Sequence, residues 1–206
     1  MLFKKWSTGW AEILARTTGE TDAYKIAMVG YTFEGILSFC LSVSVLCIFA
    51  LVFGVLKEAL LIGMAGAILK SFTGGLHLGT PLRCAVGGAL ILVGVAYLSI
   101  FLPIAAITQP VVLLILMGVN IIVCLKAPVE SKGKPLSEHH KKILAALSRI
   151  VYLLVSLVCL LFSKVWGINE VFYGMIFQAV NLLTISAYVM EKIDWVFGKI
   201  ERKPVF

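Results

Sequence analysis

Charged residues are scarce in this sequence and unevenly distributed. Lys and Arg number 18 and Asp and Glu 11 among 206 residues, so 14% of the chain is charged while 60% is hydrophobic. An ordinary soluble domain carries about 25% charged residues. Residues 85–125 contain no charged side chain, and such a run is long enough for two bilayer crossings of about 20 residues each. The composition excludes a disordered chain, a nucleic-acid-binding protein and a secreted disulfide scaffold, and it predicts an all-α, polytopic protein of the lipid bilayer.

The sequence also lacks the motifs of several enzyme classes. No HExxH, CxxC or GxSxG occurs, which removes the minimum chemistry for a zinc protease, a metal finger or a serine hydrolase. We interpret His139 and His140, in a polar stretch with two prolines, as solvent-exposed spacers. No metal and no cofactor is therefore expected.

Cysteine occurs at five positions, and the odd number argues against a disulfide framework. Four of the five lie inside apolar runs, which indicates buried thiols: Cys40, Cys47, Cys124 and Cys159. The fifth, Cys84, lies in polar surroundings.

The apolar segments predict about six membrane crossings. One is 35–56, two lie in 85–125 with a break near Leu102-Pro103 or Gln109-Pro110, and two more are 143–163 and 171–190. Residues 59–69 are apolar but have only about half the length of a full crossing.

The basic residues predict the orientation of these segments. They cluster before the first crossing, in 126–142 and from Lys192 onward, and cytoplasmic loops carry the excess of Lys and Arg. Both termini and a loop at 126–142 are therefore expected in the cytoplasm, which requires an even number of crossings. Residues 59–69 must then cross as a short or tilted span, so that 70–84 faces the cytoplasm. We interpret residues 1–206 as a single integral membrane domain.

The N-terminal segment is not expected to be a signal peptide, because it has no continuous apolar core and no small-residue cleavage site. Its apolar side chains instead recur at three- and four-residue spacing: Phe3, Trp6, Trp10, Ile13 and Leu14. This spacing predicts that residues 1–24 form an amphipathic helix at the membrane interface.

The segment Lys70 to Cys84, KSFTGGLHLGTPLRC, places one His and one Cys in a polar, Gly-rich break between apolar runs. Cysteine catalysis needs a thiolate and a nearby base, and His77 is the candidate base for Cys84. In a continuous helix the two would be about 10 Å apart along the axis. Gly79 and Pro81 disfavour a regular helix between them, so a fold that brings His77 to Cys84 is sterically available.

The neighbours of Cys84 also favour a reactive thiol. The residue precedes an apolar helix expected to start at Ala85, and Arg83 adds a neighbouring cation. Gly74 and Gly75 offer backbone N–H groups without side-chain obstruction, which suits an oxyanion hole or the close approach of a peptide backbone. The alternative is that the glycines merely cap a helix, while the His is an interfacial polar residue and the Cys a small helix-start residue.

The same segment is similar to the signature of the AgrB family (accessory gene regulator protein B), polytopic bacterial cysteine endopeptidases that mature quorum-sensing peptide precursors. The resemblance covers most of the chain and rests on the Gly-Gly-x-His motif, followed seven residues on by Cys. It implies that His77 and Cys84 are catalytic and that Lys70 and Gly75 support activity, and we add Gly74 and Arg83 as supporting or substrate-binding residues. The family usually has Arg at position 70 and Ala where this chain has Leu78.

The resemblance also implies a mechanism and a partner. The substrate would be an AgrD-like propeptide with an amphipathic leader, a central segment containing Cys, or rarely Ser, and an acidic C-terminal tail. Attack by Cys84 would release the tail and leave a thioester, from which the propeptide's own Cys closes a cyclic thiolactone. The implied location is the bacterial cytoplasmic membrane, and a homodimer is expected at the family level.

Two other classes of function stay open. Small residues in the spans and the polar residues Asn120, Gln178 and Asn181 would fit a small transporter or exporter of a peptide or small molecule. These features equally serve helix packing and interhelical hydrogen bonds. A membrane scaffold without chemistry is the third class.

Overall fold

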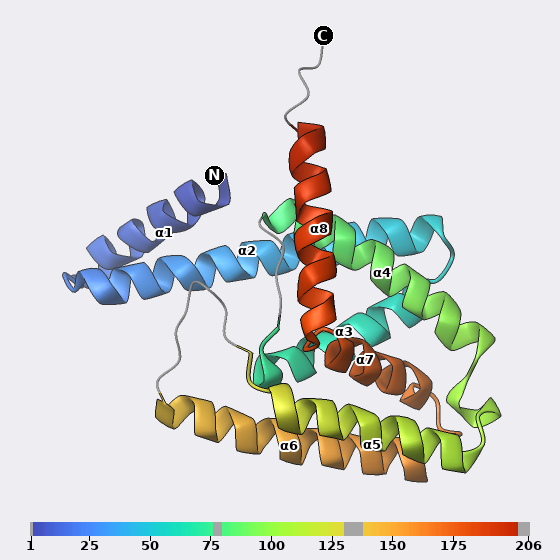
Figure 1. The fold of residues 1–206 in the computed structure, drawn as a ribbon. Helices are drawn as coiled ribbons and strands as arrows, with labels where there is room; N and C mark the ends of the chain where they lie inside the picture. The colour runs from blue at the N-terminus through green and yellow to red at the C-terminus, as the bar shows by residue number, and fades with distance from the viewer. Residues whose placement is uncertain (1, 76–79, 130–137, 202–206) are drawn as a thin grey trace.

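The computed structural model describes residues 2–75, 80–129 and 138–201. Helices dominate these residues (Figure 1), with a short 3-10 helix η1 at Ile104–Ala106. The α-helices are α1 (Leu2–Thr18), α2 (Ala23–Val52), α3 (Leu56–Thr73), α4 (Pro81–Phe101), α5 (Gln109–Lys126), α6 (Glu138–Leu161), α7 (Ile168–Val180) and α8 (Thr184–Glu201). The predicted all-α class is confirmed.

Four of these helices, α2, α4, α5 and α6, are long and apolar enough to cross a membrane. Their surfaces carry large apolar side chains that the protein leaves exposed, among them Ile48, Leu114 and Leu153. Extended apolar surface of this kind suits lipid rather than water. The chain is therefore a polytopic membrane protein, as predicted.

The charge-free run 85–125 divides at both predicted breaks. Helix α4 ends at Phe101, before Pro103, and α5 begins at Gln109, with Pro110 in its first turn. Pro103 has no N–H with which to continue a helix, whereas at a helix start the missing N–H costs nothing.

The first crossing differs from the predicted 35–56. Helix α2 starts already at Ala23, where the carboxylate of Asp22 accepts a hydrogen bond from the Tyr24 N–H at 2.9 Å. It ends at Val52, and the chain turns at Gly54, whose φ of 69° favours glycine. Lys57 and Glu58 therefore belong to the first turn of α3 rather than to the end of α2.

The predicted crossing 171–190 is wrong as a single helix. Helix α7 ends at Val180, and α8 starts at Thr184 and runs across the direction of α5 and α6 (Figure 1). The polar residues at the break explain it, since the Ser186 hydroxyl donates to the carbonyl of Val180 at 2.6 Å and competes with a continuing helix.

One end of the bundle gathers the turns after α2, after α4 and after α6. The Tyr97 hydroxyl donates to the Phe53 carbonyl at 2.6 Å, and the Asn169 side chain donates to the Ser99 carbonyl at 3.0 Å. The Lys57 ammonium lies 5.0 Å from the ring centroid of Trp166. These contacts place the start of α3 and the start of α7 at the same end.

The C-terminal ends of α3, α5 and α7 lie at the opposite end of the bundle. There the Val129 N–H donates to the Thr73 carbonyl at 2.8 Å, and Gln178 reaches Thr73 as well. Helices α3 and α7 thus run from one end of the bundle to the other, although neither meets the length and composition of a candidate span.

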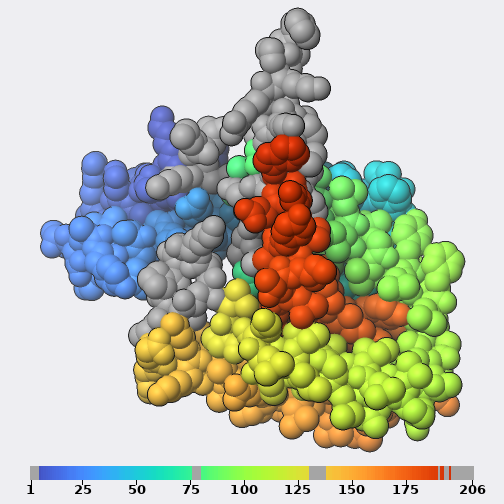
Figure 2. Space-filling model, in the orientation of Figure 1, coloured from blue at the N-terminus to red at the C-terminus, as the bar shows by residue number. Residues whose placement is uncertain are grey.

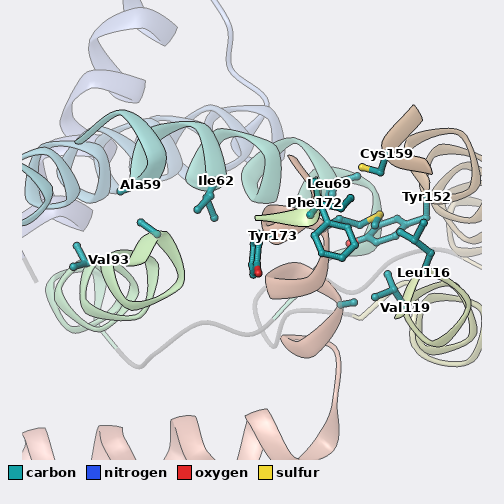
Figure 3. Packing of buried hydrophobic residues seen from close by; sticks show 14 of the residues in the cluster. Ala59, Ile62, Leu69, Val93, Leu116, Val119, Tyr152, Cys159, Phe172 and Tyr173 are labelled. Carbon is teal, nitrogen blue, oxygen red and sulfur yellow. The ribbon is translucent and has the colours of Figure 1, made fainter. Parts of the chain in front are cut away.

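Close contact between α3 and α7 forms the centre of the core. A Cβ added to Gly174 would lie 2.8 Å from the carbonyl oxygen of Ile62 and from Ala65 Cβ, so only glycine permits this approach. Leu69 of α3 and Phe172 of α7 lie together with Tyr152 of α6 in the buried cluster (Figure 3).

Helix α1 packs on the first part of α2, and together they form one edge of the molecule (Figure 2). Its buried face is made of small residues, Ser7, Ala11 and Ala15. Trp6 and Trp10 on the other face are 62% and 58% exposed. The predicted amphipathic helix is present, with its aromatic stripe turned away from the protein.

Candidate active site

The predicted catalytic segment begins at the C-terminal end of α3. Lys70 stands in the last turn, and Gly74 caps the helix with its N–H donating to the Lys70 carbonyl at 2.9 Å. Gly74 has a φ of 67°, and a Cβ at this position would overlap the carbonyl oxygen of Val129. Glycine is therefore required at 74 both for the turn and for the neighbouring backbone.

The stretch after α5 pairs with this turn. Gly74 and Val129 form a parallel β-bridge, in which the Val129 N–H donates to the Thr73 carbonyl at 2.8 Å. The peptide backbone that approaches the glycine pair is thus the chain's own. Gly75 is buried and Gly74 half-buried, and the Gly74 N–H already donates to the Lys70 carbonyl. An oxyanion hole at the glycine pair stays a prediction.

A buried amide from α7 holds the same turn. Gln178 is 1% exposed, and its Nε2 donates both to Thr73 Oγ1 and to the Gly74 carbonyl, each at 2.8 Å. The Thr73 hydroxyl, itself fully buried, donates to the Leu69 carbonyl at 3.1 Å and so has a lone pair left for Gln178.

Lys70 and Gln178 lie against Gly75. A Cβ added to Gly75 would meet Lys70 Cε at 3.1 Å and Gln178 Nε2 at 3.3 Å. Because Gly75 has no side chain, the aliphatic part of Lys70 can pass beside the amide of Gln178.

Cys84 lies in the first turn of α4. The helix begins at Pro81, with Thr80 as N-cap, so the predicted start at Ala85 is too late. Proline was expected to disrupt a helix here, but its fixed φ suits the first helical position. The Cys84 N–H donates to the Thr80 carbonyl at 3.0 Å, and the Arg83 N–H donates to Thr80 Oγ1 at 3.3 Å.

Lys70 and Cys84 interact electrostatically. Burial lowers the pKa of Lys70, which follows the apolar part of α3, and the negative charge of Cys84 opposes this shift by raising that pKa. Cys84 is half-buried. Cys84 thus combines a position in the first turn of a helix with a neighbouring ammonium group.

The predicted base His77 lies outside the described residues, so its pairing with Cys84 stays a prediction. His139 and His140 are exposed, as expected, although they stand in the first turn of α6. The predicted loop 126–142 is accordingly shorter at both ends, since α5 includes Lys126 and α6 starts at Glu138.

The remaining cysteines only partly match the expectation of buried thiols. Cys159 is buried and Cys47 half-buried, but Cys40 and Cys124 are exposed on α2 and α5. An apolar run in a membrane helix includes its outward face, so hydropathy alone does not distinguish protein from lipid surroundings. All five are free thiols.

Three residues of the site were missed by sequence reasoning: Thr73, Val129 and Gln178. The signal for Gln178 was its polar side chain inside an apolar run, which indicated an interhelical hydrogen bond. Its partner is 105 residues away, and no local pattern specifies a pairing over that distance.

Comparison with known proteins gives one family. The sequence model described as Accessory gene regulator B matches residues 7–186. The chain is also similar to AgrB-like protein 2 of Clostridium perfringens (strain 13 / Type A), with 23% identity over 194 residues, covering 87% of this chain and 91% of the relative. No solved structure matches.

Proposed function

The chain belongs to the AgrB family, because the family model covers most of it, and from this premise we propose that it is a membrane cysteine endopeptidase acting on an AgrD-like propeptide. Membership by itself implies a part in the processing of quorum-sensing peptides. The proposal adds that Cys84 is the nucleophile, His77 its base and the C-terminal tail of the propeptide the leaving group.

The observation that carries the proposal is the setting of Cys84. The thiol lies at the start of α4 and interacts with Lys70, whose helix end is fixed by Gln178 and Val129. Cys84 is the cysteine of this chain for which a helix start and a cation coincide in the described residues. A helix start and a nearby cation are features of the sites that hold nucleophilic cysteines.

The reaction follows from nucleophilic catalysis. The imidazole of His77 takes the Cys84 proton, and the thiolate attacks the carbonyl carbon at the end of the propeptide's central segment. The C–N bond breaks, the imidazolium returns its proton to the departing amine, and the tail leaves. The remaining thioester then exchanges with the thiol of the propeptide's own Cys, which closes a thiolactone and restores the Cys84 thiol. Thioester exchange is close to neutral in free energy, so no nucleotide is required for this step.

The surrounding residues have supporting roles in this proposal. Lys70 stabilises the thiolate, Gly74 and Gly75 admit Val129 and the Lys70 stem, and Arg83 adds a second cation in the first turn of α4. The protein would sit in the bacterial cytoplasmic membrane with both termini and the 126–142 region in the cytoplasm. A homodimer is part of the same proposal.

The polar residues that would fit a transporter have partners or positions within the protein. Asn120 donates to the Ser156 hydroxyl at 2.7 Å and to the Leu116 carbonyl at 2.8 Å, and Gln178 bonds to the turn after α3. Asn181 forms the C-cap of α7. The amides of Asn120 and Gln178 thus join protein segments to one another, which is their ordinary role in helix packing.

The decisive experiment uses a variant in which Cys40, Cys47, Cys124 and Cys159 are all replaced by Ala. Co-expressed with its propeptide, this variant should still produce the processed fragment, whereas adding Cys84→Ala should reduce cleavage by about 10³-fold or more, as the loss of a covalent nucleophile does. His77→Ala should act similarly, with His139→Ala as the matched control. A hydroxylamine-sensitive adduct should link Cys84 to the N-terminal fragment. Substantial cleavage by Cys84→Ala would refute the proposal.

A further inference from the structure

Gln178 is a buried polar residue that the proposed chemistry does not use. It stands in the last turn of α7, far in sequence from the catalytic segment, and yet both hydrogen bonds of its amide nitrogen go to Thr73 and Gly74. A buried amide costs free energy unless it is hydrogen-bonded. A leucine would fill this position in an ordinary core, so the amide indicates a specific requirement at this turn.

The two bonds fix a peptide group that would otherwise rotate easily. The Gly74 carbonyl belongs to the peptide plane between two glycines, and glycine has little steric preference in φ and ψ. Because this peptide group is planar, holding its oxygen also sets the direction in which Gly75 leaves the turn. The bridge from Val129 holds the preceding carbonyl, that of Thr73, from another side. Together, the hydrogen bonds of Gln178 and Val129 restrict the turn to one orientation.

The same amide borders the Lys70 side chain. Gln178 Nε2 and Lys70 Cε both lie within 3.3 Å of the position that a Cβ of Gly75 would occupy. The amide therefore forms one wall of the space through which Lys70 extends, and Lys70 interacts with Cys84.

We infer that Gln178 is a positioning residue of the active site, which holds the turn Thr73–Gly75 so that Lys70 is presented to Cys84. The inference rests on the proposed function. It assigns α7 an indirect part in catalysis. The close contact of Gly66 and Gly174 brings α7 against α3, and Gln178 then fixes the end of α3.

The test measures the reactivity of Cys84 without any propeptide. The four other cysteines are replaced by Ala, and the full-length protein in membrane vesicles is alkylated with iodoacetamide over a range of pH. Gln178→Leu should slow alkylation at neutral pH by about tenfold, because iodoacetamide reacts with the thiolate and the variant displaces the neighbouring ammonium group. It should also lower kcat for propeptide cleavage more than it changes KM. Thr73→Val removes the hydrogen bond between Gln178 and Thr73 from the side of Thr73, and it should also slow alkylation. Thr73→Ser keeps the hydroxyl and should therefore react faster than Thr73→Val.

Asn120→Leu is the matched control, because it removes an interhelical amide with two hydrogen bonds away from the site. Unchanged alkylation in Gln178→Leu, or an equal loss in Asn120→Leu, would overturn the inference. Failure of the proposed function would look different, since Cys84→Ala would then still cleave the propeptide whatever the alkylation rates are.

Discussion

The charge of Cys84 acts on the protonation of Lys70. Burial disfavours the ammonium and lowers the pKa of Lys70, and the charge on Cys84 offsets part of that loss. In the proposed mechanism, the Lys70 ammonium is the cation beside the nucleophile. Lys70 therefore supports a reactive Cys84 only while it keeps its proton, at pH values below its lowered pKa.

Replacement of Lys70 by Arg should extend cleavage toward alkaline pH. As the pH rises through the lowered pKa of Lys70, the wild type loses the cation beside Cys84, whereas a guanidinium stays charged beyond about pH 12. The alkaline limb of the pH profile of kcat/KM should therefore lie at higher pH for Lys70→Arg than for wild type. Lys70→Gln should slow cleavage at neutral pH by about tenfold. Superimposed alkaline limbs for wild type and Lys70→Arg would contradict this account.

Residue types around the site were predictable, but their partners were not. The glycine pair and Cys84 were identified because a polar break between apolar runs is a local feature of the sequence, whereas Lys70 was identified through the resemblance to the AgrB family. The reason for Gly74 is not local, since the space it leaves is filled by Val129 from beyond α5. A backbone pairing of this kind leaves no periodic signal in either segment.

Helix α1 shows which faces of an element the sequence determines. Spacing correctly predicted an amphipathic helix, because 3.6-residue periodicity separates the aromatic residues from the rest. The sequence did not show that the small residues Ser7, Ala11 and Ala15 form the contact with α2, beside Gly30. Packing through small side chains leaves Trp6 and Trp10 for a surface outside the protein, and the membrane interface is the surface that such residues prefer.

Replacing Trp6 and Trp10 together by Glu should therefore weaken propeptide processing and leave membrane insertion intact. Each Trp removes on the order of 150–250 Å² from water when fully covered, so we expect a loss on the order of tenfold in processing. Thr8→Glu adds negative charge to the same helix away from the aromatic stripe and is the control. Immunoblots of the membrane fraction and of the processed fragment measure both quantities. Equal processing by the double variant and the control would show that the stripe has no role in substrate handling.

At the scale of the whole molecule, hydropathy and contacts give different counts of crossings. Four helices meet the length and composition of a span, but α3 and α7 run between the same two ends of the bundle. By hydropathy alone α3 is not a span because it carries Lys57, Glu58 and Lys70, and α7 is not a span because it has only 13 residues. The contacts favour six passes, α2 to α7, with α8 beyond the last of them. This keeps the even count that the basic residues required, while the sixth pass becomes α7, Ile168–Val180, instead of 171–190.

Thiol labelling tests whether α3 crosses the membrane. In a chain without native cysteines, single replacements are made at three exposed positions, Thr17→Cys, Ala106→Cys and His139→Cys. If α3 crosses, Thr17 and His139 lie on one side and Ala106 on the other, because α2 and α3 return the chain to the side of its N-terminus before α4. If α3 does not cross, α4 already ends on the N-terminal side, so that Thr17 and Ala106 share a side and His139 is opposite. An impermeant maleimide applied to intact cells should therefore label Ala106→Cys alone, with the other two labelled only after the membrane is opened. Labelling of His139→Cys alone in intact cells would remove α3 from the passes and place Lys70 and Cys84 on the outer side.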